Sequence, residues 1–227
     1  MKKIAIILTN QSTYGEVLEP TGLWLAEATD FVKEITKSGF KVDYISPEGG
    51  YVPIDPRSLK SIYAPADVMK IYQNDDFRKQ ALSQSLSVNK VNAQDYAAIY
   101  FTGGHGVVWD FPDNQTLQDL TRDIYEAGGI VSSVCHGLAG LLNVRLSDGS
   151  FLINQRTVTG FTQTEEILSG KQKLVPFGTE KEAKKRGAHF IKKRPFSSFA
   201  IADNRLITGQ NPMSGEAVAH LVIDALQ

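Results

Sequence analysis

The sequence predicts an α/β protein with a doubly wound, mostly parallel sheet that carries helices on both faces. Three observations lead to this prediction. Short apolar segments typical of buried strands alternate with amphipathic helical segments along the chain. Several of these strands are apolar almost throughout, as in a parallel sheet covered on both sides. The length of 227 residues, with 42% hydrophobic residues, suits a single domain spanning residues 1–227.

A βαβ unit opens the chain. Residues 3–8 form a continuous apolar segment, which predicts the first strand. Residues 9–20 are mostly polar and predict a loop. A helix is expected over residues 23–38, because apolar side chains recur along one stripe and Gly39 supplies a stop signal. Residues 41–46 predict the second strand.

Residues 50–90 differ from the rest of the chain because they are rich in polar and turn-forming residues. Within this stretch, a helical pattern covers residues 75–85. We therefore expect a small cap insertion around residues 50–90 that lies outside the sheet.

The alternation of strand and helix resumes after the insertion. Residues 95–101 and 130–134 predict two further strands, and a helix over residues 114–127 separates them. The remaining predicted elements are a short strand at 156–159, a charged helix at 179–186, a hairpin at 199–208 and a closing helix at 214–226. This order favours a doubly wound sheet, in which ligands bind at the carboxyl ends of the strands.

Composition and charge exclude several classes of function. The net charge of −1 offers no basic face for nucleic acid. No segment approaches the roughly 20 apolar residues of a membrane span, and the apolar run after the basic N-terminus stops at Thr9, which is short for a signal peptide. The single cysteine excludes an internal disulfide and fits a reducing compartment. We expect a cytoplasmic protein that binds neither nucleic acid nor membranes.

The only cysteine follows the predicted strand at 130–134 directly. Cys135 is followed by His136 and Gly137, and then by an apolar segment with a helical pattern. A strand that turns sharply into a helix resembles a nucleophile elbow, and the N-terminus of the helix favours a thiolate. A buried structural cysteine is the alternative, since a free cysteine packs as a small hydrophobic side chain. Residues 130–142 alone leave both interpretations open.

Two further features could assist a nucleophilic cysteine, one as an oxyanion hole and one as a proton donor. The turn Gly103-Gly104-His105-Gly106 follows the strand at 95–101 and brings backbone N–H groups close to a ligand. Together with the N–H of His136 it could form an oxyanion hole, although an ordinary tight turn is the alternative. Glu27 has apolar neighbours on the first helix, so burial could raise its pKa and make it a proton donor. The alternative places Glu27 on a solvated helix face.

Glu165 and Glu166 follow the short strand at 156–159, and one of them could orient a histidine. Spacing alone favours the alternative that both are helix N-terminal charges stabilised by the helix dipole. Among the histidines other than His136, His105 lies in the glycine turn, His189 in a polar segment, and His220 in the last helix as a packed residue. No spacing matches a zinc site, a dinucleotide fingerprint or a P-loop, so we expect no metal and no cofactor.

Taken together, these motifs resemble the ThiJ/PfpI superfamily, which has the class I glutamine amidotransferase-like fold with a flavodoxin-like sheet. The similarity is greatest to its glyoxalase III (D-lactate dehydratase) and stress-chaperone branch. It covers nearly the whole chain. The motifs that carry it are Thr21-Gly22, Glu27, Ser46-Pro47-Glu48-Gly49-Gly50, Ile54-Asp55-Pro56, Gly103-Gly104-His105-Gly106, Trp109-Asp110-Phe111-Pro112, Val134-Cys135-His136-Gly137, Thr159-Gly160-Phe161-Thr162, Glu165-Glu166 and Thr208-Gly209-Gln210-Asn211-Pro212.

The resemblance implies a role for each candidate. Cys135 would be the nucleophile and His136 its partner in a triad. Glu166, rather than Glu165, would orient His136, and Glu27 would be a buried acid against the cysteine sulfur. The N–H groups of Gly104 and His136 would form the oxyanion site.

The sequence departs from the family pattern in two places. Leu138 stands where proline usually follows Cys-His-Gly, and Asp30-Phe31 stands where the first helix often carries His-Pro. We expect both departures to alter the wall of the pocket and to bear on substrate choice more than on the nucleophile.

The activity implied by the resemblance is conversion of methylglyoxal or a related 2-oxoaldehyde to D-lactate-type hydroxy acids, through a cysteine hemithioacetal, in a stress-response role. It implies a homodimer and requires no metal, glutathione or nucleotide. Two alternative functions are also open. One is a deglycase or an amidase/peptidase with the same cysteine. The other is a redox-sensing holdase chaperone in which Cys135 is oxidised to a sulfinate.

Overall fold

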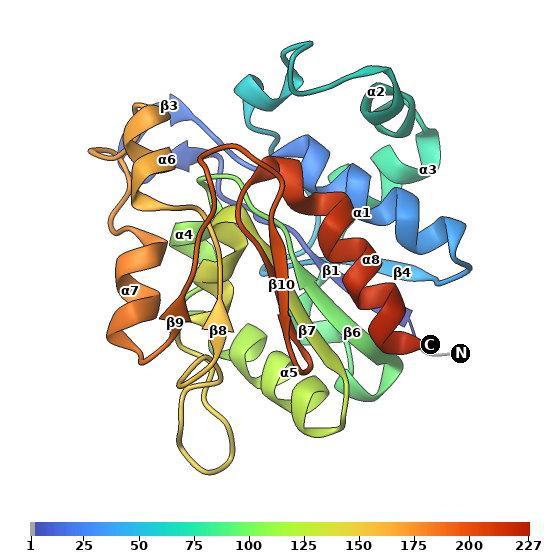
Figure 1. Cartoon of the computed structure of the whole chain (residues 1–227). Helices are drawn as coiled ribbons and strands as arrows, with labels where there is room; N and C mark the ends of the chain where they lie inside the picture. The colour runs from blue at the N-terminus through green and yellow to red at the C-terminus, as the bar shows by residue number, and fades with distance from the viewer. Residues whose placement is uncertain (1–2) are drawn as a thin grey trace.

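The computed structural model describes residues 3–227, so Met1 and Lys2 of the predicted domain lie outside the described residues. A seven-stranded sheet with the order β10-β11-β7-β6-β1-β4-β5 forms its centre (Figure 1). Its strands are β1 (Lys3–Ile7), β4 (Val42–Ser46), β5 (Leu86–Ser87), β6 (Tyr96–Phe101), β7 (Ile130–Val134), β10 (Ala200–Asp203) and β11 (Leu206–Gly209). Each neighbouring pair is parallel except β10 with β11. The predicted doubly wound, mostly parallel sheet is confirmed.

Helices cover both faces of this sheet (Figure 1). α1 (Leu25–Lys37) and α8 (Gly215–Leu226) pack against each other on one face, and α5 (Gln115–Glu126) lies on the other. Strand β1 shows why two layers form. Ile4 and Ile6 belong to the core under α1 and α8, whereas Ala5 and Ile7 belong to the core under α5. Alternate side chains of one buried strand therefore serve opposite cores.

The insertion predicted at residues 50–90 lies outside the sheet only in part. Residues 56–83 form short helices, but β5 is the edge strand of the central sheet, so the prediction is wrong for residues 86–87. The helices are η1 (Pro56–Leu59), α2 (Ala66–Tyr72), α3 (Asp75–Phe77) and the π-helical η2 (Arg78–Ser83). α2 packs against α1, and η2 contacts β4. The chain then returns to the sheet edge as β5, passes through η3 (Val88–Lys90) and η4 (Ala93–Asp95), and enters β6. The helical pattern predicted over residues 75–85 corresponds to α3 and η2.

The loop predicted over residues 9–20 is wrong in part, whereas the short strand predicted at 156–159 is confirmed. Residues 9–20 form a loop with a small hairpin, β2 (Thr13–Tyr14) and β3 (Val17–Pro20), that turns at Gly15 with φ of +59°. The strand predicted at 156–159 is β8 (Thr157–Val158), which pairs with β9 (His189–Phe190) in a separate two-stranded sheet. Both pairings depend on partners that local pattern does not specify.

The remaining helices lie near the carboxyl ends of the central strands or connect them. They are α4 (Val107–Asp110), the 3₁₀ helix η5 (Cys135–Leu141), α6 (Gln163–Leu168), α7 (Thr179–Lys185) and η6 (Pro212–Ser214). The apolar run after Cys135 is thus a 3₁₀ helix. Within residues 3–227, no helix has the length and apolar character needed to cross a membrane.

Candidate active site

Cys135 lies at the sharp turn between β7 and η5. Its φ of +57° is in the left-handed region, which a non-glycine residue adopts at a cost of about 1–3 kcal/mol. The turn is tight because Gly137 lets η5 approach β6, where a Cβ on that glycine would stand 2.3 Å from the carbonyl oxygen of Phe101. The strand-turn-helix expected around Cys135 is therefore present, with a strained residue at its bend.

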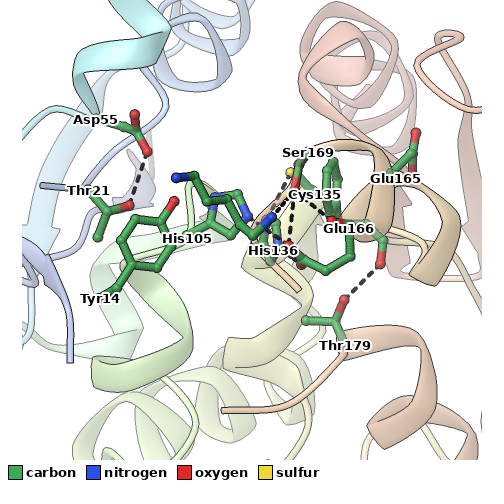
Figure 2. A network of polar contacts seen from close by, with 12 residues as sticks. Tyr14, Thr21, Asp55, His105, Cys135, His136, Glu165, Glu166, Ser169 and Thr179 are labelled. Atoms are coloured by element: carbon green, nitrogen blue, oxygen red, sulfur yellow. Dashed lines mark hydrogen bonds and ion pairs between the residues drawn. The ribbon is translucent and has the colours of Figure 1, made fainter. Parts of the chain in front are cut away.

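Three of the predicted residues form one hydrogen-bonded chain (Figure 2). Sγ of Cys135 is 3.4 Å from Nδ1 of His136, and Nε2 of His136 is 2.7 Å from Oε2 of Glu166. All three side chains are buried. Glu166 lies in the first turn of α6, which places its carboxylate beside β7 although 30 residues separate it from His136.

The neighbouring Glu165 faces another way. Its Oε2 accepts hydrogen bonds from the N–H and hydroxyl of Thr162 in a capping box. Its Oε1 accepts from the side-chain amides of Gln210 and Asn211. Geometry therefore favours Glu166 over Glu165 as the partner of the histidine. The catalytic roles themselves remain predictions.

The charge of Glu166 determines which nitrogen of His136 carries the proton. Burial acts to raise the pKa of Glu166, but the charge of His136 and hydrogen bonds from His105 and His136 hold that pKa well below its usual range. An ionised carboxylate only accepts, so Nε2 of His136 is the donor in this pair. The lone pair of Nδ1 then faces the thiol, as a general base requires.

Glu27 lies in the first turn of α1 and is fully buried. Its Oε2 accepts a hydrogen bond of 2.7 Å from the backbone N–H of Gly103. Burial raises the pKa of Glu27 from 4.5 to about 8, against the lowering effect of hydrogen bonds from Cys135 and Gly103. The alternative of a solvated helix face is wrong. The structure instead places a protonated carboxyl group against the cysteine at neutral pH.

The electrostatics of the thiol differ from the expectation. Burial raises the pKa of Cys135 well above its usual range, and the nearby Glu27 adds to this shift. The backbone N–H of His136 at the start of η5 lowers the pKa but does not compensate. The prediction that the helix N-terminus favours a thiolate is therefore wrong for the resting protein, because burial outweighs the local dipole. His136 has to accept the proton when the thiol reacts.

The predicted oxyanion residues border the same cavity as the cysteine. Gly104 and His136 both line it. His136 is the second residue of η5, where a backbone N–H has no partner within the helix. Gly104 has φ of +105°, and a Cβ there would stand 2.1 Å from the carbonyl oxygen of Gly22. Only glycine satisfies both constraints, so the backbone conformation of the turn requires glycine at position 104.

This steric constraint gives a stability prediction. Gly104→Ala combines an unfavourable φ with a clash against backbone and is expected to lower the free energy of unfolding by more than about 3 kcal/mol. Gly128→Ala is the matched control, because Gly128 has φ of +90° but its Cβ would meet no described atom within 4 Å. That control should lose about 1 kcal/mol. Equal losses in urea unfolding would show that the approach to Gly22 is not tight.

A cavity of about 260 Å³ opens above the cysteine. Its wall combines aromatic and apolar side chains with two cations, Arg57 and Lys60, and contains no carboxylate among the residues that border it. The bordering residues are Trp24, Arg57, Lys60, Tyr63, Gly104, His105, Cys135, His136, Phe161, Leu168, Ser169, Phe196, Pro212 and Met213. Arg57, Lys60 and Tyr63 come from the residue 50–90 insertion, so this segment covers part of the site.

Neither family departure reaches this wall. Leu138 is fully buried beneath the site, Phe31 stacks on Tyr100, and Asp30 borders a different cavity. The expectation that these residues alter the pocket wall is therefore wrong. His220 also differs from expectation, because its side chain is 60% exposed and lies 3.5 Å from Oε2 of Glu34 rather than packed.

Sequence reasoning gave no role to His105, which proves to be part of the network. Its Nε2 lies 3.0 Å from Oε1 of Glu166, so one carboxylate bridges two histidines (Figure 2). The only sequence signal was its position in a glycine turn at the end of β6. Ligand atoms of His105, His136 and Glu166 lie within 4.8 Å of one another, a spacing that could hold a metal ion. Both Nε2 atoms, however, point their protons at Glu166, so an ion would first displace two hydrogen bonds.

Comparison with known proteins agrees with this geometry. A sequence profile of the DJ-1/PfpI family matches residues 2–225. The chain belongs to the DJ-1/PfpI family. It is 34% identical to the glutathione-independent glyoxalase HSP31 of Saccharomyces cerevisiae, with 100% of this chain and 98% of the relative covered. It is 29% identical to glyoxalase 3 of Candida albicans over 100% of this chain and 99% of that protein.

Two solved structures of the DJ-1/PfpI fold are also similar over their whole length. The Rapid Encystment Protein of Francisella tularensis superimposes with a TM-score of 0.95 at 34% identity, covering 100% of both chains. Glyoxalase III from Candida albicans superimposes with a TM-score of 0.89 at 27% identity, covering 99% of this chain and 97% of that one. The resemblance inferred from the motifs is confirmed.

Proposed function

We propose that this protein is a glutathione-independent glyoxalase that converts methylglyoxal and related 2-oxoaldehydes to 2-hydroxy acids, with D-lactate as the product from methylglyoxal. The observation that carries the proposal is the buried set of Cys135, His136 and Glu166 with the protonated Glu27 beside it. Cys135 and His136 of this set border the cavity. Full-length relatives named as glyoxalases support it.

The first step forms a carbon–sulfur bond. Nδ1 of His136 takes the thiol proton, and Sγ of Cys135 attacks the aldehyde carbon of the substrate. The carbonyl electrons move to oxygen, and the N–H groups of Gly104 and His136 stabilise that charge. Reprotonation gives a hemithioacetal. Glu166 stabilises the imidazolium that His136 becomes during this transfer.

The second step is an internal redox exchange that needs no external reagent. The proton on the former aldehyde carbon leaves, and a proton is delivered to the neighbouring ketone carbon. The hydroxyl proton of the hemithioacetal is lost as the thioester carbonyl forms, and a proton is gained by the former ketone oxygen. The first carbon is thereby oxidised to a thioester and the second reduced to a secondary alcohol. Glu27 and His136 are the groups placed to move these protons. Water then hydrolyses the thioester, which releases the hydroxy acid and restores the thiol.

A direct assay tests the proposed activity. Purified protein incubated with methylglyoxal, without glutathione, is expected to produce D-lactate in amounts equal to the methylglyoxal consumed, as measured by chiral chromatography. In D₂O the lactate should carry deuterium at C2, because the proton transfer passes through exchangeable side chains. Absence of D-lactate would contradict the proposal. A deglycase would instead remove adducts from glycated peptides faster than free aldehyde disappears from the same solution.

We further propose that residues 1–227 act as one domain, with the 50–90 insertion as its cap, and that the protein works as a cytoplasmic homodimer. The insertion supports this organisation because it contributes Lys60 and Tyr63 to the cavity wall. Light scattering during gel filtration should give twice the mass of one chain. The mass of one chain would overturn the dimer.

A further inference from the structure

The second hydrogen bond to Glu166 is the end of a chain of contacts that begins in the insertion. Oδ1 of Asp55 accepts from the backbone N–H and from Nε of Arg57, at 2.9 and 3.0 Å. Oδ2 of Asp55 lies 2.6 Å from Nη2 of Arg57 and also accepts from the hydroxyl of Thr21 at 3.0 Å. Asp55 is fully buried. These contacts fix the position of the guanidinium group.

Arg57 then determines the tautomer of His105. Its Nη2 lies 2.9 Å from Nδ1 of His105 and 2.5 Å from the hydroxyl of Tyr14. One hydrogen of Nη2 is directed at Oδ2 of Asp55, and the other is shared between Tyr14 and His105. A guanidinium group has donors only, so Nδ1 of His105 must be the unprotonated acceptor. The proton of the neutral ring is therefore on Nε2, where it is donated to Oε1 of Glu166 at 3.0 Å. Both neighbours demand the same tautomer.

His105 cannot readily become charged in this position. Its side chain is buried. Burial lowers the pKa of His105 to about 4, with the nearby His136 and Arg57 acting in the same direction. The hydrogen bond to Glu166 acts the other way and does not compensate. His105 thus remains a neutral donor across the physiological range.

The consequence falls on Glu166. Its side chain faces His136 through Oε2 and His105 through Oε1. The hydroxyl of Ser169, the C-cap residue of α6, donates to Oε1 at 3.2 Å. With one oxygen held by His105, the plane of the carboxylate is set and Oε2 is directed at His136. The link reaches over 61 residues from the β6 turn to α6.

We propose that Arg57 and His105 are positioning residues, which hold Glu166 so that His136 presents an unprotonated Nδ1 to Cys135. Neither residue needs to touch the reacting atoms in this role. The inference rests on the proposed function for its turnover measurement, but the arrangement of protons and the reactivity of the thiol are independent of the substrate.

The test uses three histidine variants. His105→Leu removes the donor and the acceptor. His105→Gln keeps both, because its amide oxygen can accept from Arg57 and its amide nitrogen can donate to Glu166. His189→Leu, at an exposed histidine on β9, is the matched control. The rate of Cys135 alkylation by iodoacetamide is measured against pH, and this reports one site because the chain has one cysteine.

We expect His105→Leu to move the alkylation midpoint upward by roughly one pH unit, because Glu166 is no longer held in the orientation that directs Nδ1 of His136 at the thiol. Its kcat for methylglyoxal should fall on the order of 100-fold with little change in KM. His105→Gln should recover most of both, and His189→Leu should match the wild type. A merely structural role would lower the melting temperature while leaving the midpoint of the folded protein unchanged, and that result would overturn the proposal.

A measurement on the unmodified protein covers the case in which a variant fails to fold. Nitrogen-15 NMR of histidine-labelled protein should show His105 protonated on Nε2 alone between pH 5 and 8. Protonation on Nδ1, or on both nitrogens, would overturn the proposal. If the tautomer and alkylation results hold but no lactate forms, the positioning role stands and the proposed activity fails. If lactate forms but His105→Leu behaves as the wild type, the positioning role fails alone.

Discussion

Cys135→Ala is expected to abolish lactate formation, with kcat/KM for methylglyoxal falling by at least about 10⁴-fold. Cys135 is the only cysteine of the sequence, and among residues 3–227 its thiol is the side chain that forms a hydrogen bond with Nδ1 of His136. Without it the remaining donors can bind an aldehyde but cannot form the hemithioacetal. Chiral lactate analysis over a long incubation measures the residual rate.

The fold should tolerate this substitution. Alanine is smaller than cysteine, and the strained φ of +57° is imposed equally on both residues. The hydrogen bond from Gly103 to Glu27 and the two histidine bonds to Glu166 do not involve the thiol. We expect a melting temperature within a few degrees of the wild type. Activity equal to the wild type in a folded Cys135→Ala protein would exclude the covalent mechanism.

Cys135→Ser separates nucleophilicity from geometry. The hydroxyl can occupy the same site, but it has a far higher pKa than a thiol and its smaller oxygen lies farther from Nδ1 of His136 than sulfur does, so proton removal is less favourable. We expect its residual activity to be close to that of the alanine variant. Suppression of protein aggregation that survives in both variants would mean that a chaperone activity, if present, does not depend on this residue.

The sequence predicts the centre of this fold well because the central strands have a local pattern of apolar and small residues that is typical of buried strands. Residues 130–134 combine three β-branched apolar residues with two small serines, and the structure gives β7 the same limits. The β2–β3 hairpin has no apolar run that would predict its strands, because the two strands together comprise six residues in a mostly polar stretch. Its apolar Leu18 is 89% exposed, so burial in a core does not explain this hairpin either. β8 was visible as a strand, but nothing local indicates that its partner is β9 rather than the main sheet.

The residues of the site also divide into those that the sequence indicates and those that only the fold brings together. Cys135 and His136 are adjacent, and motif order indicated Glu27 and Glu166. The contacts of Arg57 with His105 and of His105 with Glu166 span 48 and 61 residues, and they depend on how the insertion folds back over the sheet. The prediction of a lowered thiol pKa is wrong for a related reason. A helix N-terminus is visible in sequence, whereas the degree of burial is a property of the whole fold.

Glu27→Gln is expected to reduce turnover by about 10²–10⁴-fold, the range associated with loss of one proton-transfer group. Glutamine has nearly the same shape, so its amide oxygen can still accept the hydrogen bond from Gly103 and its nitrogen can still face the cysteine. Only the transferable proton is lost. Asp30→Asn on the same helix is the control, because Asp30 borders a different cavity. Full turnover in Glu27→Gln would exclude the acid role.

The same variant should become more stable than the wild type as pH rises. Burial raises the pKa of Glu27 from 4.5 to about 8 in the folded protein. Between these values the unfolded chain loses the proton and the folded chain keeps it, so wild-type stability falls with rising pH, by at most about 1.4 kcal/mol per pH unit. Glutamine removes this dependence.

Urea unfolding of both proteins at pH 5, 7 and 9 measures the effect. The stability of Glu27→Gln relative to the wild type should increase through this series and level off above about pH 8, where the folded wild type has also ionised. A constant difference would show that Glu27 is already ionised in the folded state. A variant that gains stability at high pH while losing turnover identifies a buried acid that is kept for chemistry, since packing alone would favour its replacement.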